Sequence, residues 1–408
     1  MVDYRGKLVL APMVRAGELP TRLLALKYGA DLVWGPEIID KKLITCERFE
    51  NDKLGTVDFL SPGTTKIPGV TNLVFRTYPK MEQDKLIFQM GTANVDLAVQ
   101  AANVIIKDVS GIDINAGCPK HFSIHAGMGA ALLKTPDLLC AILENLVEKV
   151  GKPNNKPISV KIRLFPKQED SLALIERLCQ TGISNLTVHC RTQPMRNREY
   201  PIRDYIPKIK QITDKHNITL IINGGIQDKS DFIKTIQEVY ENGKDIGGMI
   251  ASTAETNATV FSDPPLPWYE AIKEYIKLAQ LVDNFTGNSK YMVLKMTPGK
   301  SKLYQPMSQT KTYEDMKKLL ESVEEYKDDV MKPVPFMTIE RNEDGSEKNP
   351  TNGEVDNNDG SNAKRRKGSK RGGKLKKQRI EGTTELKNEG STVGLETETK
   401  PVAAEQTV

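Results

Sequence analysis

The stretch Gly111–Pro119 reads GIDINAGCP, and its character changes part-way along. The first five residues have the pattern of a buried strand that runs into Asn115. Cys118 then follows between Gly117 and Pro119, where the chain turns. A structural Cys usually sits inside an apolar run as a small hydrophobe, whereas small neighbours at a turn let a ligand come close. The stretch therefore predicts a strand whose C-terminal end presents a thiol to a ligand.

Similar short, β-branched runs recur through the first 255 residues, and most of them are separated by stretches with helical spacing. They cover 7–13, 30–38, 85–92, 157–164, 183–192, 218–226 and 246–253. Eight strands buried on both faces and alternating with helices predict an α/β fold, a (β/α)8 TIM barrel. The alternative is an open, doubly wound sheet. That fold usually carries GxGxxG after its first strand, where this chain has LAPMVRAG.

The other parts of the chain have different patterns. The long connection Thr45–Gln83 contains TVDFL and NLVFRTY, which predict a small hairpin beside the barrel. From Pro264 the pattern indicates helices without strands, and beyond Pro335 the chain loses its apolar residues, as disordered segments do. We therefore expect a barrel domain at 1–260, a small all-α helical domain at 264–332 and a disordered C-terminal tail at 335–408.

The composition indicates in which cellular compartment the protein acts. Its 408 residues carry a net charge of +5, and its five cysteines form no CxxC pair, which favours a reducing compartment. No apolar run approaches the ~20 residues of a membrane span, and the N-terminus lacks a signal-peptide pattern. The run 364–379 holds ten Lys or Arg and no acid, as in nuclear-localisation or nucleic-acid patches; a merely solvated tail is the alternative. We expect a cytoplasmic protein, with the nucleus as a second location.

Polar, Gly or Pro residues stand at seven of the eight predicted strand ends, where a TIM barrel carries its site. The loops after strands seven and eight read NGG and AST, and both offer backbone N–H groups to an anion. Lys161 is a cation inside an otherwise apolar strand. Buried charges are normally paired, so its partner is either an anionic cofactor or a neighbouring carboxylate such as Asp113 or Glu37.

Six segments, taken in order, resemble the dihydrouridine synthases, flavoenzymes that reduce uridine in tRNA. They are APM, FQMGT, INAGCPKHFSIHAGMGAALL, VKIR, VHCRT and NGGI, and the resemblance spans about residues 5–330. The segments VWGPEIID and VFRTY are most similar to the eukaryotic type 2 branch, which modifies position 20 in the D-loop of cytoplasmic tRNA. The resemblance implies FMN as the cofactor, tRNA as the substrate and NADPH, or NADH, as the reductant.

The resemblance also implies a role for individual residues. Cys118 would be the catalytic proton donor. The cofactor would be bound by Pro12, Met13 and Val14 at the flavin ring, Gln89 and Lys161 at the ring or ribityl oxygens, His189 near the phosphate, and Asn223, Gly224, Gly225, Ala251 and Ser252 at the phosphate. The substrate would be bound by Asn115, Lys120, His125, Arg191 and Arg196. Two positions depart from the family. This chain has HCRT where the family usually has HGRT, and it has AS where the family often has GR after strand eight.

The chemistry implied by the resemblance suits these residue types. Reduced FMN can deliver a hydride to C6 of uracil, and the resulting enolate then needs a proton at C5. An unperturbed thiol is mostly protonated at neutral pH, so a Cys can act as the general acid. The base must leave its stack to react, and the RNA backbone needs cations around the barrel mouth. Candidates for the latter are Arg198, Lys290, Lys295, Lys300 and Lys302.

Two alternatives remain open at this stage. One is an FMN barrel that acts on a free pyrimidine, similar to dihydroorotate dehydrogenase. The other is an RNA-binding barrel protein without catalysis. We expect a monomer with no metal site and no membrane contact.

Overall fold

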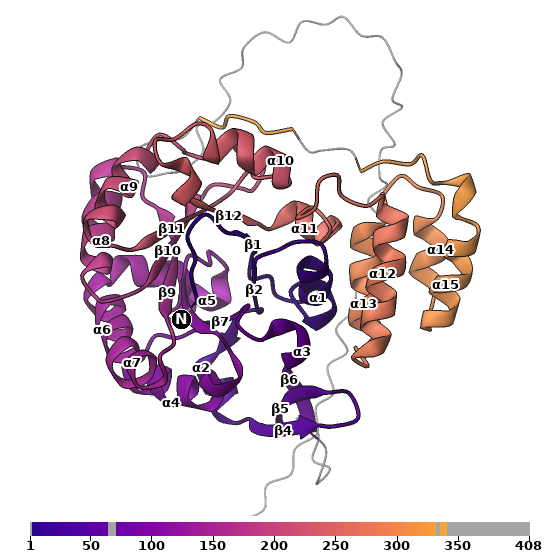
Figure 1. Cartoon of the computed structure of the whole chain (residues 1–408), viewed down its shortest axis with the longest axis horizontal. Helices are drawn as coiled ribbons and strands as arrows, with labels where there is room; N and C mark the ends of the chain where they lie inside the picture. The colour runs from indigo at the N-terminus through magenta and orange to yellow at the C-terminus, as the bar shows by residue number, and fades with distance from the viewer. Residues whose placement is uncertain (1, 64–70, 332–334, 341–408) are drawn as a thin grey trace, which may run out of the picture. The chain divides into compact units, whose positions relative to one another are not determined.

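The computed structural model describes residues 2–63, 71–331 and 335–340. Eight parallel strands pair in the order β2-β1-β12-β11-β10-β9-β8-β7, and pairing of β2 with β7 closes the barrel (Figure 1). The strands are β1 (Leu8–Leu10), β2 (Leu32–Trp34), β7 (Leu86–Gly91), β8 (Gly111–Ala116), β9 (Ile158–Leu164), β10 (Asn185–Thr192), β11 (Thr219–Asn223) and β12 (Gly247–Ile250). Each lies inside one of the eight predicted runs, so the predicted TIM barrel is confirmed.

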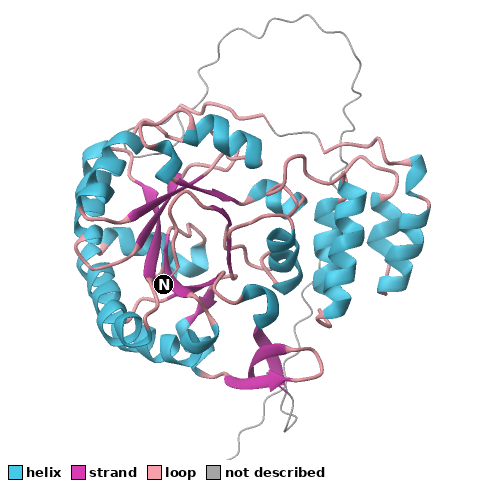
Figure 2. Ribbon diagram, in the orientation of Figure 1, coloured by secondary structure: helices cyan, strands magenta, loops and turns pink. Residues whose placement is uncertain are grey.

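Helices surround these strands, as the cyan ring in Figure 2 shows. Because both faces of a parallel sheet are covered, nearly every strand residue is buried. The helices around the barrel are α1 (Leu19–Lys27), α4 (Val95–Ile105), α6 (Pro136–Leu146), α8 (Gln168–Cys179), α9 (Ile206–Lys215), α10 (Lys229–Phe232) and α11 (Ser252–Thr256). Short helical pieces include α5 (His121–His125) and α7 (Lys152–Asn154). Cys140 of α6 and Cys179 of α8 are buried in the core.

In the long connection between β2 and β7, the two predicted strands pair antiparallel as expected, and a third strand that the sequence did not indicate extends them to a three-stranded sheet. Its strands are β4 (Glu47–Asn51), β5 (Thr56–Pro62) and β6 (Thr71–Thr77), flanked by β3 (Ile38–Ile39), α2 (Asp40–Ile44) and α3 (Pro79–Glu82). The missed strand, β4, reads ERFEN and is largely exposed. A strand with so little buried surface has no hydrophobic alternation to reveal it.

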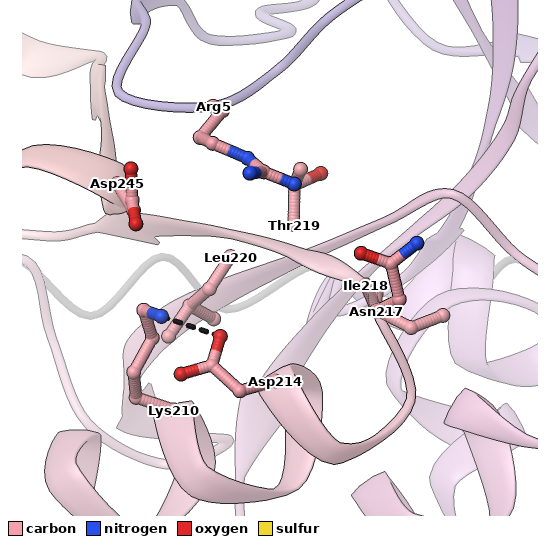
Figure 3. A pocket seen from close by; sticks show the side chains of 8 residues that line it. All are labelled: Arg5, Lys210, Asp214, Asn217, Ile218, Thr219, Leu220 and Asp245. Carbon is pink, nitrogen blue, oxygen red and sulfur yellow. Dashed lines mark hydrogen bonds and ion pairs between the residues drawn. The ribbon is translucent and has the colours of Figure 1, made fainter. Parts of the chain in front are cut away.

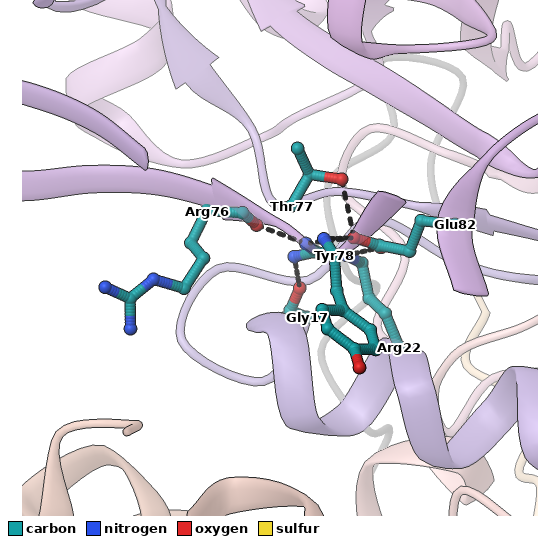
Figure 4. A network of polar contacts seen from close by, with 6 residues as sticks. All are labelled: Gly17, Arg22, Arg76, Thr77, Tyr78 and Glu82. Carbon is teal, nitrogen blue, oxygen red and sulfur yellow. Dashed lines mark hydrogen bonds and ion pairs between the residues drawn. The ribbon is translucent and has the colours of Figure 1, made fainter. Parts of the chain in front are cut away.

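A buried ion pair ties this insertion to the first barrel helix (Figure 4). Arg22 of α1 and Glu82 of α3 are 0 % and 2 % exposed, and Arg22 Nε lies 2.6 Å from Glu82 Oε1. Arg22 also donates to the carbonyl oxygens of Gly17 and Arg76, while Glu82 Oε2 accepts from the hydroxyl of Thr77. Both carboxylate oxygens and all three guanidinium nitrogens therefore have partners, which is the condition for burying such a pair.

Helices without strands follow the barrel, as the pattern from Pro264 predicted. They are α12 (Trp268–Leu281), α13 (Thr286–Met296), α14 (Tyr304–Gln309) and α15 (Tyr313–Glu321). The domain limits drawn from the sequence stay predictions. Six residues of the predicted tail, 335–340, are described, whereas the basic run 364–379 lies outside the described residues. None of the helices described in the structure is both long and apolar enough to cross a membrane.

Candidate active site

Strand register brings the predicted polar side chains to one end of the barrel. Residues paired across neighbouring strands share a level, and these pairs lie between the middle and the C-terminal end of β7 to β11. The pairs are Gln89 with Asp113, Asn115 with Lys161, Arg163 with His189, and His189 with Asn223. Since active sites of TIM barrels form at this end, residues far apart in the sequence form one candidate site.

The turn that carries Cys118 is fixed by Asn115. The side-chain oxygen of Asn115 accepts hydrogen bonds from the backbone N–H groups of Gly117 and Cys118, each 3.0 Å long. The carbonyl of Cys118 accepts from Ala130 N at 2.9 Å, and the nearby Gly129 has a φ of 60°. The thiol is therefore held on a rigid, half-buried turn, and Asn115 keeps only its amide nitrogen for other partners.

A buried carboxylate orients Gln89. Asp113 Oδ2 accepts from Gln89 Nε2 at 2.8 Å, and Oδ1 accepts from the Ser159 hydroxyl at 2.7 Å. Burial raises the pKa of Asp113 to about 6, against the effect of these two hydrogen bonds. Because its nitrogen is committed to Asp113, Gln89 has its carbonyl oxygen available to accept a hydrogen bond from a ligand.

Lys161 has no carboxylate partner of the kind that the sequence left open. Lys161, Asp113 and Glu37 are all described residues, and no ion pair joins Lys161 to either carboxylate. Burial, followed by the neighbouring Arg163, lowers the pKa of Lys161 to about 8, while Asp113 and Cys118 raise it. Lys161 is half-buried in an otherwise buried strand, so its ammonium is accessible to a ligand, and a ligand with negative charge would suit it.

His189 is neutral and has a defined tautomer. Burial and the charges of Lys161, Arg163 and Arg191 hold its pKa well below the usual value. Its Nε2 lies 3.2 Å from Nη1 of Arg191. Because a guanidinium can only donate, Nε2 is the acceptor, and the ring proton is assigned to Nδ1. His189 can therefore donate one hydrogen bond to a ligand.

The turn after β11 forms an anion cradle. Gly224 and Gly225 have φ values of 111° and 82°, which favour glycine. A Cβ on Gly224 would lie 3.0 Å from Arg191 Nη1, and one on Gly225 would lie 3.2 Å from Arg203 Nη2. Arg191 Nη2 and Arg203 Nε are buried and have no hydrogen-bond partner among the described residues. The backbone of this turn carries no side chains, and beside it lie two guanidinium groups that each have a nitrogen without a partner in the described part of the chain. Together these groups suit the phosphate of a cofactor.

Neither Arg191 nor Arg203 was assigned to the phosphate site from the sequence, but both lie beside the anion cradle. Arg191, expected at the substrate, is 2 % exposed and lies beside the cradle. Arg203, which the sequence analysis did not single out, donates to the carbonyl of Gly224 at 3.3 Å. The replacement of GR by AS after strand eight removes the arginine that the family carries at that position, but two other arginines stand beside the cradle. No motif marked Arg203, because it stands in an irregular loop before α9.

Glu37 was considered from the sequence only as a partner for Lys161, but it lies beside Asn115. Its Oε1 is buried without a hydrogen-bond partner among the described residues, and a Cβ on Gly91 would lie 2.5 Å from it. Burial raises the pKa of Glu37, against the effects of a hydrogen bond with Asn115 and the charge of Lys120. Glu37 thus faces the amide side of Asn115 and helps to fix that residue's orientation.

The other predicted residues stand on loops at the same end of the barrel. Pro12, Met13 and Val14 follow β1, while Ala251 and Ser252 follow β12; Asn223 donates from Nδ2 to the Met249 carbonyl at 2.9 Å. Lys120, His125 and Arg196 are exposed. Of the cations suggested for RNA, Lys300 and Lys302 are exposed, whereas Lys290 donates to the Thr310 carbonyl and Lys295 pairs with Glu255.

Two histidines beside the thiol turn were not treated as a pair in the sequence analysis. The Nε2 atoms of His121 and His125 lie 2.8 Å apart, one turn of α5 from each other. Within residues 2–63, 71–331 and 335–340, no group of three or more Asp, Glu, His or Cys side chains is arranged to hold a metal ion.

A separate cavity of about 130 Å³ lies away from this site (Figure 3). Its lining includes Arg5, Lys210, Asp214, Thr219 and Asp245. Thr219 is the first residue of β11, so the cavity is at the N-terminal end of the barrel strands. That end of a TIM barrel contributes to stability rather than catalysis.

Comparison with known proteins agrees with this arrangement. The family model described as "Dihydrouridine synthase (Dus)" matches residues 9–335. The chain belongs to the dihydrouridine synthase family.

Two curated relatives cover most of the chain. The tRNA-dihydrouridine(20) synthase [NAD(P)+] of Saccharomyces cerevisiae is 56% identical over 79% of this chain and 85% of its own length. The Schizosaccharomyces pombe protein of the same name is 45% identical over 79% of this chain and 66% of its own length. A third, the tRNA-dihydrouridine(20a/20b) synthase [NAD(P)+] of S. cerevisiae, is 30% identical over 55% of this chain and 54% of its own length. The predicted resemblance to the family and to its eukaryotic type 2 branch is therefore confirmed.

Proposed function

We propose that this protein is a tRNA-dihydrouridine synthase that reduces the C5–C6 double bond of uridine 20 in the D-loop of cytoplasmic tRNA. The observation that carries the proposal is the position of Cys118. The thiol stands on a fixed turn at the catalytic end of the barrel, one strand away from Lys161, a half-buried cation without an ion-pair partner among the described residues. The relatives that match most of the chain carry the corresponding name.

We infer that FMN is the bound cofactor, which supplies a hydride to C6 of the base. The chain offers a donor or acceptor for each part of such a molecule. The Gly224–Gly225 turn with Arg191 and Arg203 suits its phosphate. The polar oxygens and nitrogens of the cofactor would be met by three groups: Nδ1–H of His189, the carbonyl of Gln89 and the ammonium of Lys161.

The chain's own part in the reaction is to place a proton. Hydride arrival at C6 leaves negative charge over C5 and the adjacent carbonyl oxygen. The Cys118 thiol would donate its proton to C5 of the base. Asn115 supports this step because it holds the backbone N–H of Cys118 in place.

Recognition of the RNA falls to exposed groups around the site. Lys120, His125 and Arg196 are exposed there, and Lys300 and Lys302 are exposed beyond the barrel. Such cations neutralise phosphates without reading sequence. We propose further that NADPH or NADH reduces the flavin, that residues 264–332 act as a tRNA-binding domain, and that the protein is a monomer of the cytoplasm, with access to the nucleus through the run 364–379.

The proposal is tested by visible spectroscopy of the purified protein under anaerobic conditions. A flavin spectrum should bleach with NADPH and recover on addition of unmodified tRNA. Recovery with a free pyrimidine or a quinone, but not with tRNA, would favour a dehydrogenase of the dihydroorotate type. A colourless protein that still binds tRNA would favour an RNA-binding barrel without catalysis.

Cys118→Ala gives the first specific prediction. Because proton donation is lost while the cofactor contacts stay, turnover on tRNA should fall by about 10²–10⁴-fold with the flavin still bound. Stopped-flow absorbance after mixing the reduced enzyme with tRNA measures this. Cys140→Ala, which changes a core thiol on α6, is the control and should keep normal turnover. Full activity in the Cys118 variant would rule out the thiol as the acid.

A further inference from the structure

Residues 335–340 form an extended segment that lies against the loop between β10 and α9; Figure 1 draws it as the short gold stretch near the label α10. The N–H of Met337 donates to the carbonyl of Arg198 at 2.8 Å, and Met337 forms a parallel bridge with Glu199. The ring of Phe336 packs against that of Tyr200, with centroids 5.5 Å apart. Both the backbone and a side chain of the segment therefore contact the stretch Arg198–Tyr200.

The same stretch holds Arg191. Nε of Arg191 donates to the carbonyl of Glu199 at 2.8 Å, and the ring of Phe336 lies 5.7 Å from the guanidinium carbon. Aromatic faces attract guanidinium groups at this separation. Arg191 is thus contacted at Nε by the Glu199 carbonyl, at Nη1 by His189 and at one face by the ring of Phe336. The contact with Phe336 is the one that residues 335–340 supply.

Phe336 also reaches the anion cradle. A Cβ on Gly225 would lie 3.6 Å from Cζ of Phe336, next to the guanidinium of Arg203. The buried Nη2 of Arg191, without a partner among the residues that the structure describes, is part of the same cradle. One side of the cradle is therefore built by a residue that follows the helices α12 to α15 in the chain.

We propose that Phe336 is a positioning residue of the phosphate site, acting through Arg191. Its ring, centred 5.7 Å from the guanidinium carbon, restricts the movement of the Arg191 side chain beside Gly224, and its edge covers the Gly225 side of the cradle. The proposal rests on the proposed function, because it takes the phosphate to be that of the flavin cofactor. It assigns a part of cofactor binding to a segment that the composition alone marks as the start of a tail.

The test compares two ligands that differ only in the phosphate. The full-length protein and its Phe336→Ala variant are stripped of flavin and titrated with FMN and with riboflavin, with quenching of flavin fluorescence as the signal. Phe336→Ala should weaken FMN binding by about three- to tenfold and leave riboflavin binding unchanged. Phe336→Trp, which keeps an aromatic face, should restore FMN affinity. Thr338→Ala, an exposed position of the same segment, is the matched control.

The outcomes separate the two proposals. No FMN binding by the unchanged protein would overturn the proposed function. Normal FMN binding by both the unchanged protein and Phe336→Ala would overturn the role of Phe336 alone. Equal weakening of FMN and riboflavin binding would show a general effect on the barrel and would also overturn it. Thermal melting of the flavin-free variants checks that each remains folded.

Discussion

Lys161 shows how one half-buried side chain can make cofactor binding depend on pH. Burial lowers its pKa to about 8 in the protein without ligand. An anionic ligand favours the charged form, so above that pH binding must first return a proton to the amine. We expect the Kd for FMN to rise by about tenfold per pH unit above pH 8 and to be nearly flat below it.

Fluorescence titrations between about pH 7 and pH 9.5, on either side of that pKa, measure this dependence. Lys161→Met should bind FMN more weakly at every pH, without the slope. Persistence of the slope in that variant would assign it to another group. His189 does not contribute in this range, because its pKa is held well below the usual value and the ring is neutral throughout.

At the scale of elements, the three-stranded sheet depends on the contact between Arg22 and Glu82. Breaking a buried pair leaves an uncompensated charge, which typically costs about 3–5 kcal/mol of unfolding free energy. Glu82→Gln should therefore lower the denaturant midpoint clearly. The control is Glu148→Gln, which breaks the exposed pair with Lys152 and should change the midpoint little. Equal midpoints for the two variants would contradict this account.

The elements that could be predicted are those with a strong hydrophobic signal. All eight barrel strands were found because each buries both faces, and the polar ends of those strands located the site. β4 was missed because its ERFEN sequence lies largely exposed.

Individual contacts within the site were less accessible to sequence analysis. Spacing could suggest that Lys161 needs an anion, but whether it pairs with Asp113 depends on distances in space. Arg203 and Glu37 stand outside regular elements, where no periodicity reveals the direction of a side chain. The contact of Phe336 with Arg191 joins two distant parts of the sequence, one of them in a stretch that composition marks as disordered.

For the whole molecule, the basic run 364–379 carries a prediction about tRNA affinity, although it lies outside the described residues. Replacement of its ten Lys and Arg by Gln and Ser in the full-length chain should weaken tRNA binding. The slope of log K against log salt should become shallower by roughly 0.7–0.9 for each phosphate that the run neutralises in the unchanged protein. The flavin spectrum should stay unchanged, because the site is built by residues before 341.

Binding curves at several salt concentrations provide the measurement, with a tRNA and an unrelated RNA of similar length compared. The weakening should be similar for both RNAs, since backbone contacts do not read sequence. Unchanged affinity and slope would leave nuclear import or a merely solvated tail as explanations of the run. Fluorescence microscopy of the same variant would then test nuclear import directly.

The contact between Phe336 and Arg191 has a practical consequence for recombinant work. The match to the family model ends at residue 335, one position before the aromatic ring. A protein fragment trimmed at that homology boundary would keep Cys118 and the helices α12 to α15, yet it would leave the cradle open on one side. Such a fragment should purify paler than the full-length protein and regain its yellow colour only with added FMN.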